Sequence, residues 1–321
     1  MGEHSEKAKW IVTRRDVLKA AGLMLAGHSG RPLPAGTENN SPVARMRFGI
    51  VADSHYAKTD RRNNRYYRES ATKMAECVGL MNVEKVVFLA ELGDFKDQDD
   101  PAVERNTVDY LKTIEGVFQK FKGNRYHILG NHDMDSISKN TFLETVKNTH
   151  VRVRSSYYSF EHNSMHFIVL DANFRADGTD YDSGNFDWTD ANIPRHQLEW
   201  LRKDLASTSK SVVVFVHQRL DGEDDYCVRN AVEVRHILEK NNNVLAVFQG
   251  HHHSGHCSQI EGIHYYALTA MVEGSGEQNN AYAVVEVHQD DTITVTGYRR
   301  AFNIKLEKAR SARFLKNLHL Y

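Results

Sequence analysis

Val244-Leu245-Ala246-Val247-Phe248 is followed almost at once by Gly250-His251-His252-His253, and this stretch decides the fold. A short apolar run bounded by a turn residue predicts a buried strand. Histidines two apart at the end of a strand can both reach one point if the backbone turns there. In an open α/β sheet, ligands bind in the crevice beyond the carboxyl ends of the strands. The stretch therefore predicts an α/β fold with a binding site at one edge of a sheet.

Four other short polar segments also follow apolar runs. They are Asp53-Ser54-His55, Gly93-Asp94, Gly130-Asn131-His132-Asp133, and His217 after Val212–Val216. Five strand ends therefore deliver carboxylate, amide and imidazole groups to the same edge. These groups are suitable ligands for manganese, iron or zinc.

The order D-x-H, G-D, G-N-H-D, H, G-H-x-H resembles the calcineurin-like metallophosphoesterase family. The resemblance extends from about Met46 to Phe302. It implies an α/β fold in which two packed mixed β-sheets are flanked by helices, a four-layer sandwich. It also implies a dinuclear metal site whose ligands are Asp53, His55, Asp94, Asn131, His217, His251 and His253.

The resemblance assigns a role to each ligand. Asp53, His55 and His253 would hold one ion, and Asn131, His217 and His251 would hold the other. Asp94 would bridge both ions. His132 would bind no metal; it would stabilise the transition state and protonate the leaving oxygen, with Asp133 orienting it.

A two-metal site suits phosphate ester hydrolysis. Anionic phosphoryl oxygens repel an incoming hydroxide, and two cations about 4 Å apart neutralise them and activate a bridging water. We therefore expect two divalent or transition-metal ions, with manganese favoured over iron or zinc. The alternative, that His132 and His217 are ordinary core histidines, would require several coincidences at once.

A second resemblance concerns the substrate. Arg65-Tyr66-Tyr67-Arg68 is similar to a segment of the manganese-dependent ADP-ribose/CDP-alcohol diphosphatases, some of which carry Gln where this chain has His55. This resemblance implies a small phosphorylated substrate of nucleotide type, bound by Arg65 and Tyr66. Tyr56, Tyr66 and Phe95 could stack on a base, and Arg61, Arg62 and Arg65 could meet a second phosphate.

Two other functions remain open. One is a phosphomonoesterase or 3',5'-cyclic nucleotide phosphodiesterase on the same scaffold. The other is a non-catalytic binding module on a decayed phosphoesterase fold, which would lack metal ligands or His132.

The composition bounds the class of protein. The 321 residues are 40% hydrophobic, enough for a sizeable core, and the formal net charge is -1. Balanced charge argues against a stable nucleic-acid or membrane-surface partner. The three cysteines do not make a disulfide framework; Cys77 fits a helix core, and a metal role for Cys257 is conceivable.

We expect three regions. Residues 1–42 resemble a twin-arginine signal segment and linker, with Arg14-Arg15 followed by an apolar stretch at 20–27 that is too short for a permanent membrane span. The export machinery would then be a partner, and the protein would be periplasmic or extracellular in a bacterium. A basic amphipathic helix is the alternative. Residues 43–302 would form the catalytic domain, and residues 303–321 a basic, helix-compatible tail.

Within the catalytic domain, the second sheet should begin with a hairpin of Tyr157–Phe160 and His166–Leu170. Three further runs after Ile260 are expected to be hairpin strands: Ile263–Leu268, Ala281–Val287 and Thr292–Val295. The intervening residues 173–194 have no regular pattern but contain several aromatics. Long irregular loops in compact domains are usually functional or disordered. We interpret this loop as a flap near the site, with a purely structural excursion as the alternative.

Overall fold

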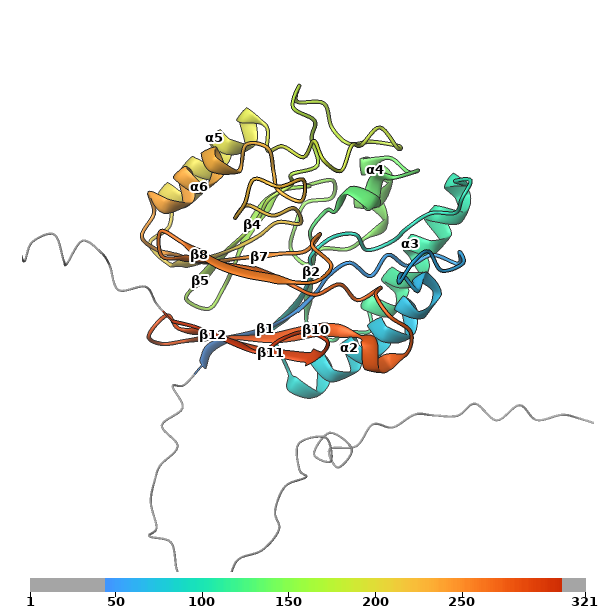
Figure 1. The fold of residues 1–321 in the computed structure, drawn as a ribbon. Coiled ribbons are helices and arrows are strands. Elements are labelled where there is room, and N and C mark those ends of the chain that lie inside the picture. The colour runs from blue at the N-terminus through green and yellow to red at the C-terminus, as the bar shows by residue number, and fades with distance from the viewer. Residues whose placement is uncertain (1–43, 308–321) are drawn as a thin grey trace, which may run out of the picture. The chain divides into compact units, whose positions relative to one another are not determined.

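The computed structural model describes residues 44–307. The expected export segment and most of the expected basic tail lie outside these residues. Within them, two six-stranded sheets form the centre of the fold (Figure 1). In spatial order, the first sheet contains β12 (Ile304–Leu306), β11 (Ile293–Arg299), β10 (Ala281–His288), β1 (Ala44–Val51), β2 (Phe88–Glu91) and β3 (Asn124–His127). The second contains β4 (Tyr158–His162), β5 (Met165–Val169), β6 (Ser211–Phe215), β7 (Val244–Gln249), β9 (Ile263–Ala267) and β8 (His256–Ile260).

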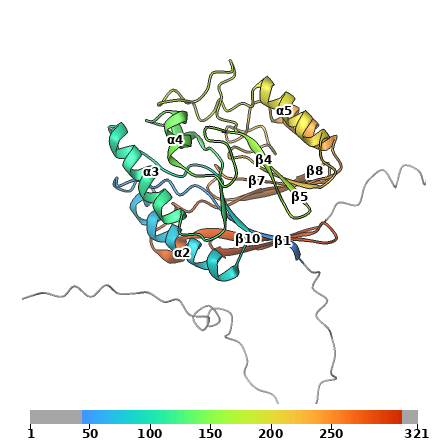
Figure 2. The same ribbon diagram turned by 180° about the vertical axis from the view of Figure 1, so that it is seen from behind.

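Helices cover the outer face of each sheet, as the two views show (Figures 1 and 2). The first sheet packs against α2 (Ser70–Glu84), α3 (Glu104–Phe118) and α4 (Lys139–Thr145), whereas the second packs against α5 (Arg195–Ala206) and α6 (Ala231–Glu239). Short 3-10 turns are η1 (Tyr67–Glu69), η2 (Asn131–Met134) and η3 (Glu277–Asn279). The layers run helix, sheet, sheet, helix. The predicted four-layer α/β fold is therefore confirmed.

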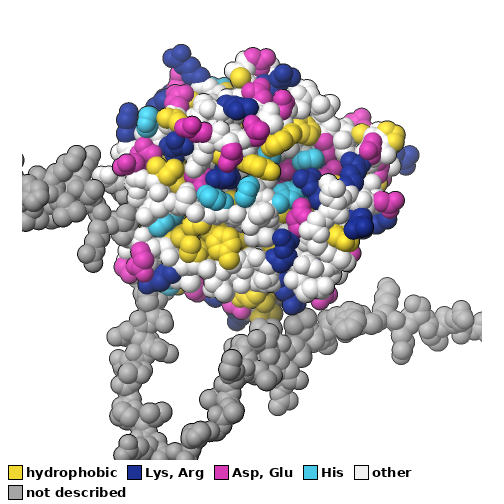
Figure 3. Space-filling view, in the orientation of Figure 1, with side chains coloured by type: hydrophobic (Ala, Val, Ile, Leu, Met, Phe, Trp, Pro, Cys, Tyr) yellow, Lys and Arg dark blue, Asp and Glu magenta, His cyan; other side chains and the backbone are white. Residues whose placement is uncertain are grey.

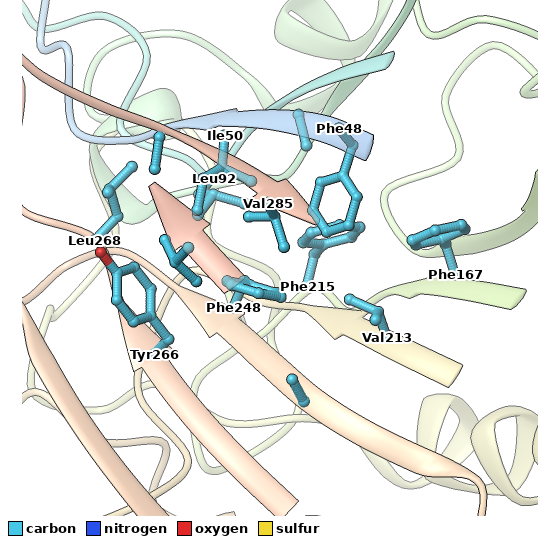
Figure 4. Packing of buried hydrophobic residues seen from close by; sticks show 14 of the residues in the cluster. Phe48, Ile50, Leu92, Phe167, Val213, Phe215, Phe248, Tyr266, Leu268 and Val285 are labelled. Carbon is cyan, nitrogen blue, oxygen red and sulfur yellow. The ribbon is translucent and has the colours of Figure 1, made fainter. Parts of the chain in front are cut away.

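Aromatic side chains fill the space between the sheets (Figure 4). The Phe48 ring stacks on Phe88 at 4.8 Å and meets Phe167 and Phe215 edge-on at 5.7 and 5.8 Å. Successive residues of a strand point to opposite faces, so Phe167 enters this core while Ile168 packs beneath the helices. Each fully buried Phe contributes about 1.5–3 kcal/mol relative to an exposed one. This core fixes the two sheets so that their strand ends meet.

The direction of the strands determines where the five polar segments with the predicted ligands lie. β1, β2 and β3 are parallel neighbours, and so are β5, β6 and β7. The segments that follow β1, β2, β3, β6 and β7 therefore leave at the carboxyl ends of two parallel sets.

The three runs after Ile260 are hairpin strands, as predicted, but they divide between the two sheets. β10 and β11 form the expected antiparallel hairpin in the first sheet. β9, however, joins the second sheet, parallel to β7 and antiparallel to β8, a strand that was not expected. β9 is buried on both sides: Tyr265 packs under the helices and Tyr266 between the sheets.

The sheet also continues past Phe302, the expected end of the catalytic domain. Ile304–Leu306 forms β12 and pairs with β11 instead of joining a helix-compatible tail. No helix within residues 44–307 is long and apolar enough to cross a membrane.

Candidate metal centre

The structure brings the predicted ligands together at the strand ends. Asp53, His55 and His253 offer ligand atoms that all lie within 4.8 Å of one another, and Asp94, His217 and His251 form a second such group. Asn131 lines the same cavity as Asp94 and His251, a hollow of about 190 Å³. Figure 3 shows histidine side chains together near the centre of one face, with apolar side chains next to them.

The backbone at the site is strained. Asp53, His55, Asp94 and His251 have φ values of 53°, 43°, 55° and 65°, in the left-handed region that non-glycine residues avoid. Such strain persists only where the surroundings enforce it, and it clusters at functional sites. The turn at Gly130 also packs closely against the turn at Asp94. A Cβ atom added to Gly130 would lie 2.2 Å from the backbone nitrogen of Asp94, so only glycine fits there. Strain therefore marks four of the seven predicted ligands.

Asp94 lies between the two groups. Its Oδ2 is 3.4 Å from His55 Nε2 and 3.2 Å from His217 Nε2. Asp53 Oδ1 lies 3.6 Å from His253 Nε2 and 3.9 Å from His217 Nε2. Asp94 thus occupies the position that a bridging carboxylate requires.

Hydrogen bonds hold three ligand histidines by Nδ1, so that Nε2 faces the carboxylates. The partners are Asp97 Oδ2 for His55 at 3.0 Å, the Leu92 carbonyl for His217 at 2.8 Å, and Glu273 Oε1 for His253 at 2.7 Å. This arrangement is typical of metal-binding histidines, whose other ring nitrogen fixes the tautomer. Burial lowers the pKa of His55 to about 3, which keeps its ring neutral and able to bind a cation.

The pKa shifts of His217 and Asp94 also indicate a site that favours bound cations. Burial acts to lower the pKa of His217, yet the carboxylates of Asp94 and Asp53 raise it to about 9. Burial opposes ionisation of Asp94, but His217 and His132 hold the pKa of its carboxyl well below the usual range. The site therefore favours positive charge next to Asp94.

Several buried polar atoms complete this fit. Asp53 Oδ2, both side-chain polar atoms of Asn131, and His251 Nε2 have no hydrogen-bonding partner within residues 44–307. Buried polar atoms normally have one, and each exception calls for an explanation. The nitrogen and oxygen donor set suits two ions such as manganese, iron or zinc. When bound, such ions supply charge neutralisation of phosphoryl oxygens and a more acidic water.

The predicted partnership between His132 and Asp133 is wrong. The fully buried Asp133 carboxylate accepts hydrogen bonds from the backbone nitrogens of Gly130, Phe95 and Asp94, at 2.8, 2.9 and 3.1 Å. It fixes the loops after β2 and β3 and does not contact the His132 ring. Asp97, and not Asp133, lies beside the His132 ring, with Oδ2 at 3.5 Å from His132 Nδ1.

The buried Lys96 side chain holds the segment that contains His132 and Asp135 near the site. Lys96 Nζ donates to the His132 carbonyl at 2.6 Å and also pairs with Asp135. The His132 side chain lines the cavity and is 26% exposed. It can therefore reach a substrate, as its predicted role requires.

Of the two predicted substrate-binding residues, only Arg65 lines the cavity. The Tyr66 hydroxyl accepts a hydrogen bond from Arg61 at 3.2 Å and is not among the lining residues. Tyr56 and Phe95 are buried, so neither can stack on a base as predicted. Cys257 packs against the core between the sheets instead of joining the metal ligands.

Sequence reasoning missed four residues at the site. They are Asp97, Glu273, Trp188 and Tyr226. Trp188 belongs to the 173–194 loop, which does approach the site as predicted: Trp188 lines the cavity, and Phe186 lies 5.6 Å from the His132 ring. The aromatics of that loop were the available signal. Tyr226, Asp97 and Glu273 have no comparable signal in the sequence.

The fold and this site define a metal-dependent phosphoric ester or anhydride hydrolase. The chain belongs to the calcineurin-like phosphoesterase family, whose sequence model matches residues 46–255. The third hypothesis, a non-catalytic module, predicted missing ligands, and every predicted ligand is present in the cavity or beside it.

Known proteins extend the family assignment. A manganese-dependent ADP-ribose/CDP-alcohol diphosphatase of Oryza sativa subsp. japonica is 26% identical over 77% of this chain and 90% of its own length. A protein of the same name from Xenopus laevis is 24% identical over 77% of this chain and 86% of its own. Among solved structures, a dimetal phosphatase from Danio rerio superposes with a TM-score of 0.71 at 21% identity, covering 83% of this chain and all of that one. That likeness confirms the fold.

Proposed function

We propose that this enzyme is a manganese-dependent diphosphatase that splits the pyrophosphate of nucleoside-diphosphate-linked compounds such as ADP-ribose or a CDP-alcohol. The observation that supports it is the position of Arg65. Its side chain lines the cavity together with Asp94, His132 and His253. The relatives that carry this activity in their names align over most of the chain.

A diphosphate needs a cation beyond the reacting phosphate. Arg65 Nε lies 3.9 Å from Glu273 Oε1, and the same carboxylate oxygen accepts a hydrogen bond from His253. The Arg65 guanidinium is thereby placed next to the ligands and remains one-third exposed. A guanidinium binds phosphate through paired, charge-assisted hydrogen bonds. One phosphate would lie at the ligand groups and the other at Arg65.

The second candidate is a cyclic nucleotide phosphodiesterase. A Fibrobacter succinogenes protein named as a probable cyclic nucleotide phosphodiesterase is 24% identical over 67% of this chain and 76% of its own length. A cyclic monophosphate has a single phosphate, so it would gain less from Arg65. The two candidates therefore differ in how strongly activity depends on that residue.

Arg65→Ala should lower kcat/KM for ADP-ribose by roughly 10- to 100-fold, because hydrogen bonds to charged groups are worth about 1.5–3 kcal/mol. The loss on p-nitrophenyl phosphate should be much smaller. Arg62→Ala is the matched control, because Arg62 pairs with the exposed Asp100 and does not line the cavity. The measurement is kcat/KM for ADP-ribose, CDP-choline, cyclic AMP and p-nitrophenyl phosphate. Equal losses on all substrates would favour the phosphodiesterase or monoesterase candidate.

We also infer that the protein is exported through the twin-arginine pathway. The support is Arg14-Arg15 followed by the apolar stretch 20–27. This pathway transports folded proteins, which suits an enzyme that acquires metal before export.

Replacing Arg14 and Arg15 together with Lys should retain the enzyme in the cytoplasm in an active form, because both lie outside the catalytic domain. Cell fractionation with an activity assay checks this in a bacterium that has the pathway. Undiminished periplasmic activity of the double variant would rule out twin-arginine export.

A further inference from the structure

Two exposed aromatic side chains lie at the mouth of the metal centre. Trp188 is 41% exposed and Tyr226 is 39% exposed, and both line the cavity. The other large hydrophobic residues that are exposed within residues 44–307 are all valines. Isolated exposed apolar residues are ordinary, but these two rings lie side by side, with centroids 5.5 Å apart at 49°.

The aromatic pair borders one ligand group only. The His251 ring lies 6.0 Å from Trp188 and 5.7 Å from Tyr226. Arg65, in contrast, is next to Glu273 and His253, which belongs to the other ligand group. The cavity therefore has an aromatic wall on the His251 side and a guanidinium on the His253 side.

The loop that holds Trp188 is anchored on the N-terminal side of that residue. Tyr181 is fully buried, and its hydroxyl donates to the Asp187 carbonyl. The Gly184 nitrogen donates to the Met134 carbonyl at 2.8 Å, and Lys139 Nζ donates to Asp180 at 2.5 Å. Trp188 thus projects from a segment whose neighbours are tied to the body of the enzyme.

The loop that holds Tyr226 is also fixed. Arg219 is buried, and its guanidinium contacts Asp221 at 3.0 Å and Asp224 at 3.2 Å. The backbone nitrogen of Arg219 donates a hydrogen bond to the Tyr226 carbonyl at 3.0 Å. Aromatic surfaces held in place before binding lose little freedom when a ligand stacks on them.

We propose that Trp188 and Tyr226 form the nucleobase-binding wall of this enzyme, on which the base of the substrate stacks while its distal phosphate faces Arg65. This inference rests on the proposed diphosphatase function and adds the direction in which the substrate lies. Every base has a π face, so stacking accepts both adenine and cytosine. The larger purine ring covers more of the wall, so ADP-ribose should have a lower KM than a CDP-alcohol.

Nucleotide binding can be tested without catalysis. AMP added to the manganese-loaded enzyme should quench tryptophan fluorescence, whereas ribose 5-phosphate, which has no base, should not. The quenching should disappear in Trp188→Phe, a variant that retains an aromatic ring and should still bind AMP in calorimetry. The matched control is Trp200→Phe, whose ring lies on α5 against Tyr157 and away from the cavity. Quenching that persists in Trp188→Phe would overturn the proposal.

Kinetics test the same wall with substrate. Trp188→Ala should raise KM for ADP-ribose by roughly 5- to 100-fold, the range found when a stacking aromatic is removed. It should affect methyl diphosphate much less, because that compound keeps the pyrophosphate and lacks a base. Trp188→Tyr should recover most of the ADP-ribose KM. Equal losses on both substrates would show that Trp188 shapes the site without binding the base.

The two proposals can fail separately. If the wild-type enzyme does not cleave ADP-ribose, the diphosphatase proposal fails, and AMP quenching through Trp188 still decides whether the wall binds a base. If ADP-ribose is cleaved but neither quenching nor KM depends on Trp188, the wall is refuted and the diphosphatase function stands.

Discussion

Asp94→Asn should lose at least one of the two metal ions and nearly all activity. Asp94 lies within 3.4 Å of ligand nitrogens from both groups, so its negative charge serves both sites. Asn keeps the Oδ1 atom that accepts the His132 backbone hydrogen bond at 2.8 Å, so the turn should survive. The charge stabilisation that two metals supply is worth several kcal/mol, and the expected fall in kcat is at least about a hundredfold.

Elemental analysis and kcat should be measured together on the wild type and the variant. The wild type should contain up to two ions per chain, lose activity on chelation and recover it best with manganese. Asp60→Asn provides a matched control, since the Asp60 carboxylate is 92% exposed and pairs only at the surface with Arg68. Two ions retained by Asp94→Asn, or full activity of the metal-free wild type, would contradict the two-metal assignment.

The metal ligands were predictable because they depend on local sequence and one general rule. Each ligand lies in a short polar segment that follows an apolar run, and parallel strands deliver such segments to a common edge. His217, for example, follows the predicted strand at 212–216 and reaches within 3.2 Å of Asp94, more than a hundred residues earlier. The packing of each strand was predictable in the same way, because successive side chains of a strand point to opposite faces of the sheet.

The residues that support the ligands were not predictable in this way. Glu273 follows β9, whose sheet was not predicted; β9 pairs with β7, and Glu273 lies 2.7 Å from Nδ1 of His253, which follows β7. Asp97 lies three residues after Asp94, and nothing local distinguishes its side chain from that of Asp133. The backbone conformation decides between them: Asp133 turns toward backbone nitrogens, and Asp97 turns toward the imidazoles of His55 and His132.

The geometry around Asp97 leaves two roles for His132, and these make different predictions. His55, Asp97 and His132 also have ligand atoms within 4.8 Å of one another, so this trio could itself hold an ion. In the family-based assignment, His132 binds no metal and donates a proton to the leaving oxygen. Although burial acts the other way, His132 and the hydrogen bond from His55 lower the pKa of Asp97, which therefore stays an anion beside the His132 ring.

His132→Ala should retain both ions and lose roughly 10²–10⁴ in kcat, the usual contribution of a general acid. The loss should be largest for substrates with an alkoxide leaving group and smaller for p-nitrophenyl esters, because nitrophenolate leaves without a proton. Asp97→Asn should reproduce part of this dependence on the leaving group, since it keeps the His132 ring but removes the anion 3.5 Å from its Nδ1. The measurement is metal content together with kcat over a series of leaving groups for both variants. Loss of an ion from His132→Ala would make His132 a ligand, and an equal loss on every leaving group would exclude it as the proton donor.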